Sequence, residues 1–182
     1  MIELRRLSPA LRFILQGGPS ACAAAGTAFG VPLPEKACRA NARDGRAALW
    51  LGPDEYLLLG PAAEHDRLAA GLEAALAGIA HSLVDVSQRQ VAWRLSGKRA
   101  SELLNTGCPL DLDVAEFPPA GCTRTVLGKA QIVLWRQAAE EYHLEIWRSY
   151  SDYVREFLLE AARSDLGEII NEGDDHAQRS AG

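Results

Sequence analysis

Three polar residues near the middle of the chain, Asp85, Ser87 and Arg89, form the cluster that is most suggestive of chemistry. Successive side chains of a β-strand point to opposite faces, so this two-residue spacing would place all three on one face. Such a face could bind an anion or order a loop of a partner protein. The alternative is an exposed polar face, whose Asp85–Arg89 ion pair would contribute well under about 1 kcal/mol.

The other residues capable of chemistry favour structural interpretations. Asp111 and Asp113 could act as paired carboxylates, but they flank Leu112 in an expected loop, and turn residues are the better interpretation. His143 lies in an expected strand, where a solvent-facing position is favoured over a metal-ligand role. We therefore expect neither a catalytic residue nor a metal ligand here.

The cysteines and the sequence motifs point the same way. The four cysteines are Cys22, Cys38, Cys108 and Cys122. None of them forms a CxxC pair, and we expect buried or idle thiols without a redox or zinc role. The nucleophile-elbow, Walker and dinucleotide-binding patterns are missing from the sequence. The sequence thus predicts no catalytic, cofactor-binding or metal site in this chain.

The four tryptophans all fall on expected strands, and an arginine follows directly after three of them. They are Trp50, Trp93, Trp135 and Trp147. Core packing explains most of these tryptophans, yet Trp and Arg are also the residues enriched at energetically important interface positions. We therefore take Arg94, Arg136 and Arg148 as candidate interface residues.

Composition and charge exclude several classes of protein. The chain has 182 residues, 48% hydrophobic and 24% charged, close to the average for soluble globular proteins. Its net charge of −5, from 19 basic and 24 acidic residues, disfavours nucleic-acid binding. No apolar run approaches the roughly 18 residues of a membrane span, and Met1–Pro9 does not resemble a secretory signal. We expect a cytoplasmic protein that binds neither membranes nor nucleic acid.

Hydrophobic periodicity predicts runs of strands with helices between them. The beginning of the chain is expected to be extended and irregular, with weak alternation over Leu11–Gln16. Strands are expected over Arg46–Leu51, Glu55–Gly60, Ser82–Ser87, Gln90–Ser96, Cys122–Leu127, Gln131–Arg136 and Tyr142–Trp147. Helices are expected over Ala21–Phe29, Glu64–Ala80, Gly97–Asn105 and Tyr150–Arg163. This order indicates an α+β fold with mostly antiparallel sheet. We expect one compact domain over residues 1–163, built of two related subdomains of about 1–87 and 88–163. The acidic segment 164–182 is expected to be a disordered tail.

An ordered series of short motifs between Trp50 and Leu159 resembles the γ subunit of heterotetrameric sarcosine oxidase. The motifs include Trp50-Leu51-Gly52-Pro53-Asp54-Glu55-Tyr56-Leu57-Leu58-Leu59, Leu83-Val84-Asp85-Val86-Ser87-x-Arg89, Leu95-Ser96-Gly97-x-x-Ala100-x-x-Leu103-Leu104, Gly107-Cys108-Pro109-Leu110-Asp111-Leu112, Arg124-Thr125-x-Leu127 and Arg148-Ser149-Tyr150. No single motif is diagnostic, but their order along the chain is fairly specific.

The resemblance implies a non-catalytic structural subunit with no cofactor of its own. In that family the other subunits carry FAD, FMN, NAD, zinc and the tetrahydrofolate site. Together they oxidise sarcosine to glycine, hydrogen peroxide and a one-carbon unit. The implied partners are the α, β and δ subunits, most of all the large α subunit. The implied fold resembles the folate-binding domain of the aminomethyltransferases.

Two other interpretations remain open. The first is a stand-alone folate-binding or one-carbon-transfer protein of the aminomethyltransferase type, and the second is a homo-oligomeric scaffold. An iron–sulfur-assembly relative of that fold carries a Lys-Gly-Cys-Tyr-x-Gly-Gln stretch. The nearest run here, Ala120-Gly121-Cys122-Thr123-Arg124, lacks its Lys, Tyr and Gln. The departure weakens the case for folate binding and for a reactive thiol at Cys122.

Overall fold

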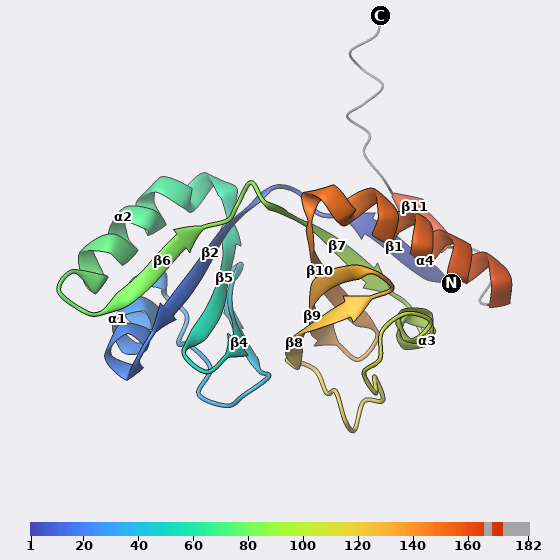
Figure 1. Cartoon of the computed structure of the whole chain (residues 1–182), viewed down its shortest axis with the longest axis horizontal. Coiled ribbons are helices and arrows are strands. Elements are labelled where there is room, and N and C mark those ends of the chain that lie inside the picture. Colours follow the sequence, from blue (N-terminus) through green and yellow to red (C-terminus); the bar gives the residue numbers. More distant parts are fainter. Residues whose placement is uncertain (166–168, 173–182) are drawn as a thin grey trace, which may run out of the picture. The chain divides into compact units, whose positions relative to one another are not determined.

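The computed structural model describes residues 1–165 and 169–172 of the chain, which form two compact units (Figure 1). Unit 1 consists of Met1–Ser8, Val91–Pro119 and the residues from Thr125 onward. Unit 2 consists of Pro9–Gln90 and Ala120–Arg124. Each unit has its own sheet and its own helices, and the expected α+β class with mostly antiparallel sheet is confirmed.

Unit 2 is built on a five-stranded sheet with the order β3-β4-β5-β2-β6. Its strands are β2 (Ala10–Gly17), β3 (Ala40–Arg43), β4 (Arg46–Gly52), β5 (Glu55–Pro61) and β6 (His81–Asp85). All neighbouring strands in this sheet run antiparallel. The sequence predicted the β4–β5 hairpin correctly, and its turn places Asp54 at a φ of 57°, where Asp is better tolerated than most residues. The short strand β3, three of whose four residues are exposed, was missed.

Two helices pack against the unit 2 sheet. Helix α1 (Pro19–Phe29) begins with a proline in its first turn and ends at Gly30, which has a φ of 81° and donates its N–H to the Gly26 carbonyl. Helix α2 (His65–Leu76) follows the 3₁₀ turn η1 (Ala62–Glu64). Four-residue spacing brings the leucines of α2 onto one buried face. The core of unit 2 contains Phe13, Leu15, Ala25, Phe29, Leu58, Leu68, Leu72 and Leu76.

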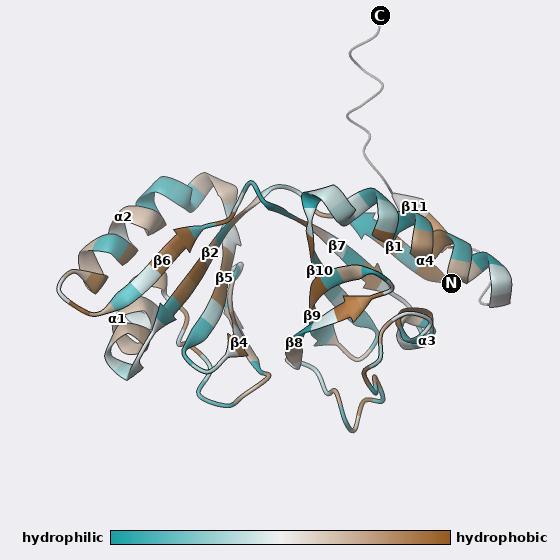
Figure 2. Cartoon of the chain, in the orientation of Figure 1, coloured by the Kyte–Doolittle hydropathy of each residue, from teal (hydrophilic) through white to brown (hydrophobic). Residues whose placement is uncertain are grey.

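Unit 1 is built on a six-stranded sheet with the order β11-β1-β7-β10-β9-β8. Its strands are β1 (Ile2–Arg6), β7 (Gln90–Ser96), β8 (Cys122–Leu127), β9 (Ala130–Ala138), β10 (Glu141–Trp147) and β11 (Ile169–Glu172). Helix α3 (Ala100–Asn105), the 3₁₀ turn η2 (Arg148–Tyr150) and helix α4 (Ser151–Asp165) complete the unit. Figure 2 shows hydrophobic residues along the strands, and hydrophilic and hydrophobic residues mixed on α2 and α4. The core of unit 1 contains Leu95, Leu103, Leu104, Leu134, Leu144, Ile146, Val154 and Leu158.

A row of aromatic rings fixes the beginning of α4. The Tyr150 and Tyr153 ring centroids lie 6.4 Å apart, and those of Tyr153 and Phe157 lie 6.1 Å apart. The Tyr153 hydroxyl accepts a hydrogen bond of 3.0 Å from the Lys129 backbone N–H. Glycine is required at Gly128, which has a φ of 57° and where a Cβ atom would collide with the Tyr153 hydroxyl. The row therefore holds η2 and α4 against the β8–β9 turn.

Two expectations about the ends of the chain were wrong. Residues 1–87 were expected to form one subdomain, but Met1–Ser8 belongs to unit 1, because β1 pairs antiparallel with β7 and places Glu3 opposite Ser96. The disordered tail was expected to begin at residue 164, but α4 continues through Asp165 and β11 pairs in parallel with β1. The rest of that expected tail, residues 166–168 and 173–182, lies outside the described residues. In the part of the chain that is described, no helix is long and apolar enough to cross a membrane.

Candidate functional site

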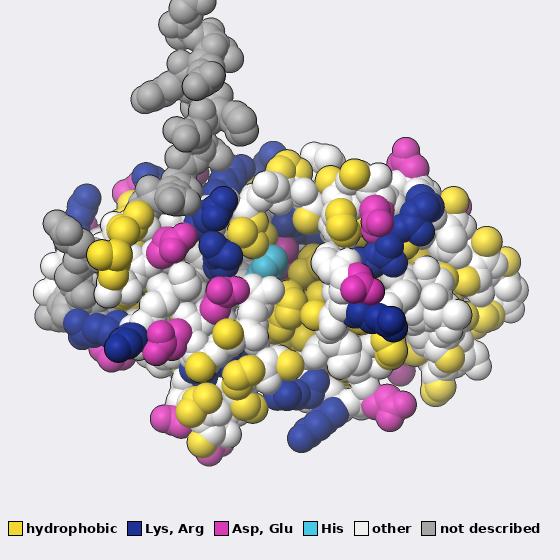
Figure 3. Space-filling view, turned by 180° about the vertical axis from the view of Figure 1, so that it is seen from behind, with side chains coloured by type: hydrophobic (Ala, Val, Ile, Leu, Met, Phe, Trp, Pro, Cys, Tyr) yellow, Lys and Arg dark blue, Asp and Glu magenta, His cyan; other side chains and the backbone are white. Residues whose placement is uncertain are grey.

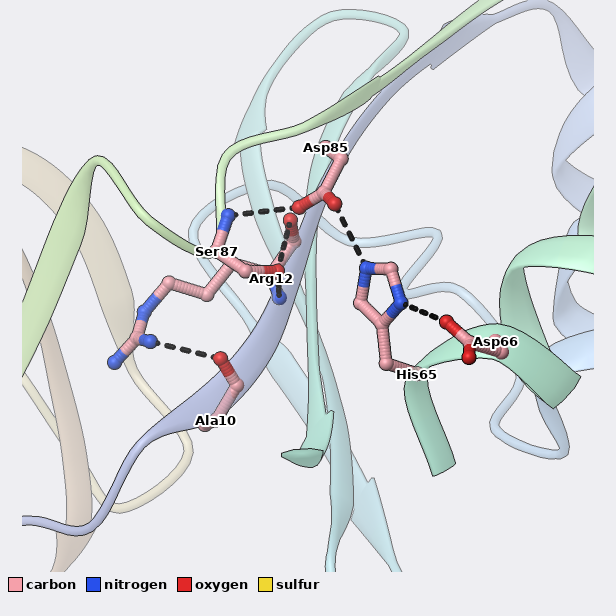
Figure 4. Close-up of polar contacts among 6 residues, drawn as sticks. All are labelled: Ala10, Arg12, His65, Asp66, Asp85 and Ser87. Carbon is pink, nitrogen blue, oxygen red and sulfur yellow. Dashed lines mark hydrogen bonds and ion pairs between the residues drawn. The ribbon is translucent and has the colours of Figure 1, made fainter. Parts of the chain in front are cut away.

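The polar cluster suggested by the sequence lies in unit 2, where β6 ends (Figure 4). Asp85 is the last residue of β6, and its Oδ1 accepts a hydrogen bond of 2.8 Å from the Ser87 backbone N–H. Its Oδ2 lies 2.7 Å from Nε2 of His65, the first residue of α2. The other ring nitrogen, His65 Nδ1, lies 2.9 Å from Asp66 Oδ1. One imidazole therefore bridges two carboxylates and joins α2 to β6.

The Ser87 hydroxyl faces the backbone of β2 rather than His65. Ser87 Oγ accepts a hydrogen bond of 2.8 Å from the Arg12 backbone N–H and donates one of 3.4 Å to the Arg12 carbonyl. The backbone N–H of Val86 also donates to the Arg12 carbonyl at 2.9 Å. These bonds continue the pairing of the chain with β2 beyond the end of β6.

This geometry does not suit nucleophilic catalysis. A serine nucleophile needs an imidazole nitrogen facing its hydroxyl to take up the proton. Here both nitrogens of His65 face carboxylates, and the Ser87 hydroxyl bonds to backbone. The cluster acts as a clamp, defined here as His65, Asp66, Asp85 and Ser87, that holds α2, β6 and β2 together.

The electrostatics of the clamp follow from its contacts. The pKa of His65 is raised above its ordinary value of 6.5 by its hydrogen bonds, first to Asp66 and then to Asp85. Burial raises the pKa of Asp85, but hydrogen bonds from Ser87 and His65 outweigh burial and leave that pKa lowered. Both shifts favour a protonated imidazole between ionised carboxylates.

Arg89, the third residue of the predicted strand face, lies in the turn that follows β6 rather than on the strand. Because β6 ends at Asp85, Ser87 and Arg89 follow in a turn, where the Arg89 backbone N–H donates to the Val86 carbonyl at 3.0 Å. The structure therefore brings Asp85 and Ser87 together through a turn rather than through a shared strand face. Sequence reasoning missed Arg12, which is 2% exposed and donates from Nη1 to the Ala10 carbonyl at 3.0 Å. Its only sequence signal is a charge inside an apolar run.

Arg136, expected at an interface, is instead an interior residue of unit 1, only 4% exposed. Its Nη1 donates to the carbonyls of Leu112 at 3.1 Å and Phe117 at 2.7 Å. Its Nε donates to the Ala139 carbonyl at 3.1 Å, and its guanidinium carbon lies 5.1 Å from the centre of the Tyr142 ring. Arg136 therefore anchors the loop between α3 and β8 to the sheet, which corrects the interface expectation for this residue.

The other two candidate interface arginines are more accessible. Arg94 on β7 places Nη2 3.8 Å from Glu3 Oε1 on the neighbouring strand β1. Arg148 is exposed in η2, between Trp147, which is 43% exposed, and Tyr150, which is 41% exposed. Exposed aromatic residues beside an arginine have the composition of energetically important interface positions. The interface role of Arg94 and Arg148 stays a prediction.

The expectation that His143 faces solvent was wrong. His143 is 8% exposed, and its Nε2 lies 2.8 Å from Oε1 of Glu145, which is 1% exposed. The His143 ring also lies 5.6 Å from the Trp135 ring. Alternation correctly placed His143 and Tyr142 on opposite faces of β10, but both faces are buried at this point of the strand.

The cysteines and the acidic loop residues do not form a reactive site. No disulfide links the four cysteines, and burial raises the pKa of the Cys122 thiol to about 12, so the thiol stays protonated. Cys38 is exposed, and Cys22 is partly buried. The interpretation of Asp111 and Asp113 as turn residues is confirmed, since each accepts a hydrogen bond from a backbone N–H two residues on. Over residues 1–165 and 169–172, no three His, Cys, Asp or Glu side chains gather as a metal site.

Comparison with solved structures defines the class of fold. The glycine cleavage system aminomethyltransferase T from Bartonella henselae matches 93% of this chain with a TM-score of 0.69 and 14% identity. The match covers 47% of that enzyme. A similarity at this low identity concerns the fold alone, which is therefore that of the aminomethyltransferases.

Comparison with known sequences defines the family. A family model described as sarcosine oxidase, gamma subunit family, matches residues 16–164. The sarcosine oxidase subunit gamma of an Arthrobacter species is 32% identical over 145 residues, which cover 79% of this chain and 70% of the relative. That of Corynebacterium sp. (strain P-1) is 31% identical over 163 residues, covering 88% and 79%. The chain belongs to the sarcosine oxidase gamma subunit family, as the resemblance implied.

A structure of an assembled enzyme also matches this chain. A chain of the heterotetrameric sarcosine oxidase from Corynebacterium sp. U-96, solved with pyrrole 2-carboxylate, aligns with a TM-score of 0.83 at 28% identity. The alignment covers 89% of the chain described here and 84% of that chain.

Proposed function

We propose that this chain is a structural and assembly subunit, without a catalytic site of its own, of a heterotetrameric sarcosine oxidase. The complex demethylates sarcosine oxidatively to glycine, hydrogen peroxide and a one-carbon unit that passes to tetrahydrofolate. The partners of this chain are the α, β and δ subunits, most of all the large α subunit. FAD, FMN, NAD, zinc and tetrahydrofolate are bound by those partners.

The observation that carries this proposal is the match to a chain of a heterotetrameric sarcosine oxidase over 89% of this chain. The match extends over both units, so the similarity is not limited to one unit or to a short motif. Family membership over residues 16–164 supports the same assignment.

The chemistry of the described polar residues supports a structural role. The groups most capable of catalysis are engaged within the chain: both nitrogens of His65 with carboxylates, the hydroxyl of Ser87 with backbone, and the guanidinium of Arg136 with carbonyls. On the face shown in Figure 3, acidic and basic side chains are interspersed rather than gathered into a patch of one sign. Polar groups engaged in this way stabilise the fold instead of acting on a substrate. This arrangement is the one expected of a structural subunit.

Co-expression tests the proposal directly. The chain, carrying an affinity tag, is expressed with the α, β and δ subunits of a sarcosine oxidase from the same organism and recovered through the tag. We expect the three other subunits to co-purify in stoichiometric amounts with sarcosine oxidase activity. Recovery of the chain alone, or as an oligomer of itself, would contradict the proposal.

A pair of charge reversals on two consecutive elements refines this test. Arg148→Glu changes the arginine of η2 that lies between the exposed aromatic residues Trp147 and Tyr150, and Arg163→Glu is the matched control in the last turn of α4. We expect Arg148→Glu to lower the recovery of the partner subunits and Arg163→Glu to leave it unchanged. Equal recovery with both variants would remove η2 from the interface while leaving the assembly role intact.

Titration with tetrahydrofolate separates this proposal from a stand-alone one-carbon-transfer protein. The isolated chain is titrated with tetrahydrofolate and heat is recorded by calorimetry. We expect no saturable binding at micromolar concentrations. Micromolar binding by the isolated chain would favour the one-carbon-transfer interpretation instead.

A further inference from the structure

Unit 2 contains a groove of about 420 Å³ that none of the clamp residues lines. Its apolar wall comes from the beginning of α1 and the loop that follows this helix, with Pro19, Pro32, Leu33 and Pro34 among the lining residues. A volume of this size lies within the range of about 300–1,000 Å³ that is typical of small-molecule sites, so it has room for an inserted side chain.

The apolar wall is formed before anything binds. A Cβ atom on Gly26 of α1 would lie 3.3 Å from the Pro32 Cα, so helix and loop are already in tight contact. The Asn41 side chain donates to the Pro32 carbonyl at 2.8 Å and fixes the loop from β3. Three prolines among the lining residues restrict the backbone further. A preformed wall lowers the entropic cost of binding.

The polar groups at the floor of this groove are uncharged. The Cys22 thiol donates to the Gly17 carbonyl at 3.3 Å, and burial raises its pKa. Burial, together with the neighbouring Cys22, raises the pKa of Tyr56 to about 12. The floor can therefore contact an apolar side chain without leaving a charge desolvated.

The rim of the groove is acidic. Asp54, in the β4–β5 turn, and Glu35, in the loop after α1, both line the opening and are exposed. Neither carboxylate takes part in an ion pair with any described residue. An occupant with a positive charge beside an apolar side chain would match both the rim and the walls.

We propose that this groove receives an extended segment of another sarcosine oxidase subunit, which inserts an apolar side chain between α1 and the loop after it. A lysine or arginine next to the inserted residue contacts Asp54 and Glu35. The inference rests on the proposed function, because it identifies where a partner subunit binds this chain. The charge of the rim selects a basic segment, and the proline-lined wall selects an apolar residue beside it.

Replacing either of two exposed alanines by lysine, one in the groove and one outside it, tests the role of the groove. Ala23 lines it on an exposed position of α1, and Ala70 is exposed on α2 of the same unit, away from the groove. Lysine is well tolerated in helices, so Ala23→Lys and Ala70→Lys should both fold, which their melting temperatures verify. In co-expression with the other subunits, we expect Ala23→Lys to bind them about tenfold more weakly, because the new cation occupies the groove and repels the basic segment. Ala70→Lys should bind as the unaltered chain does.

The rim is tested by its salt dependence. Asp54→Asn with Glu35→Gln removes both rim charges, and asparagine suits the positive φ of residue 54. Glu73→Gln with Glu140→Gln is the control pair of exposed carboxylates with the same change in net charge. We expect the rim pair, and not the control pair, to weaken assembly about fivefold at low salt, with the difference vanishing in about 1 M salt.

Photo-crosslinking identifies the occupant. A benzoylphenylalanine at Thr27, which lines the groove on α1, should crosslink to a segment of another subunit that contains lysine or arginine. A crosslink to a second copy of this chain, or none, would overturn the inference. Equal assembly of Ala23→Lys and Ala70→Lys would also overturn it, while leaving the proposed function standing. If the unaltered chain recovers no other subunit, the proposed function itself fails and this inference with it.

Discussion

Unit 1 and unit 2 both use a cationic side chain to join a segment of chain to a sheet, but they do so at different depths. In unit 1, Arg136 is 4% exposed and donates to the carbonyls of Leu112, Phe117 and Ala139. In unit 2, His65 bridges Asp66 and Asp85, and the side chains of His65 and Asp85 are 34% and 47% exposed. Water can therefore replace a lost hydrogen-bond partner at His65 but not at Arg136.

Burial of these polar contacts determines where the chain tolerates substitution. A buried polar group that loses its partner costs its full desolvation free energy, whereas an exposed ion pair contributes little. Substitutions of polar residues in the interior of unit 1 should therefore destabilise the protein strongly. Those in the clamp of unit 2 should mainly alter its dependence on pH.

The largest expected effect follows from replacing Arg136. Arg136→Met removes the donors to Leu112, Phe117 and Ala139 and should lower the free energy of unfolding by about 3 kcal/mol, measured by urea denaturation. The loop between α3 and β8 should become sensitive to proteolysis. Arg136→Lys keeps the charge but loses the planar guanidinium. Its free energy of unfolding should therefore lie between those of the unaltered chain and Arg136→Met. A loss below about 1 kcal/mol for Arg136→Met would place this residue with the exposed pairs of unit 2 instead.

A smaller loss of stability is expected at the buried contact between His143 and Glu145 in unit 1. His143→Gln removes the imidazole from Glu145 Oε1 and should cost about 2 kcal/mol in urea denaturation, because Glu145 is 1% exposed. His81→Gln is the control, since His81 is exposed and bonds only to the carbonyl of Ile79 among the described contacts. The same small change for both variants would mean that burial does not govern the cost.

The strand β11 should contribute less than either buried group. A chain ending at Asp165 loses the pairing of Ile169 with Ile2. Its melting temperature should fall by roughly 2–4 °C relative to a chain ending at Glu172, the shift that a loss of about 1 kcal/mol produces in a chain of this length. Differential scanning calorimetry measures both chains. Equal melting temperatures would show that β11 adds nothing to unit 1.

The smallest effect concerns the clamp and its pH dependence. Because the pKa of His65 is raised above 6.5, its contribution to stability is fully present below about pH 6.5 and is lost as pH rises through the raised value. The free energy of unfolding of the unaltered chain should fall between about pH 6 and pH 8 more than that of His65→Gln. Parallel curves for the two proteins would contradict a charged bridge at this position.

The sequence predicted most of the local structure, because periodicity and turn residues act within a short segment. The β4–β5 hairpin, the leucine face of α2 and the turn at Asp111–Asp113 all follow from spacing and are present. Strands β1 and β11 were missed because their stability comes from partners far along the chain, β7 and each other.

The candidate site could be predicted only in part for the same reason. The spacing of Asp85 and Ser87 pointed to a polar cluster. However, His65 lies 20 residues before its partner Asp85, and Arg12 lies 75 residues before its partner Ser87. No local pattern connects residues so far apart. Arg136 illustrates the opposite error: a Trp-Arg pair resembles an interface, whereas the carbonyls that bind the arginine lie in a loop whose path only the fold determines.

Native mass spectrometry of the co-expressed complex measures whether this chain is one of its subunits. We expect one assembly in which a single copy of this chain accompanies one copy each of the α, β and δ subunits, with the Ala23→Lys variant depleted from it and Ala70→Lys retained. An assembly of the other three subunits that is complete and active without this chain, or a species containing only copies of this chain, would show that the chain is not a subunit of a sarcosine oxidase.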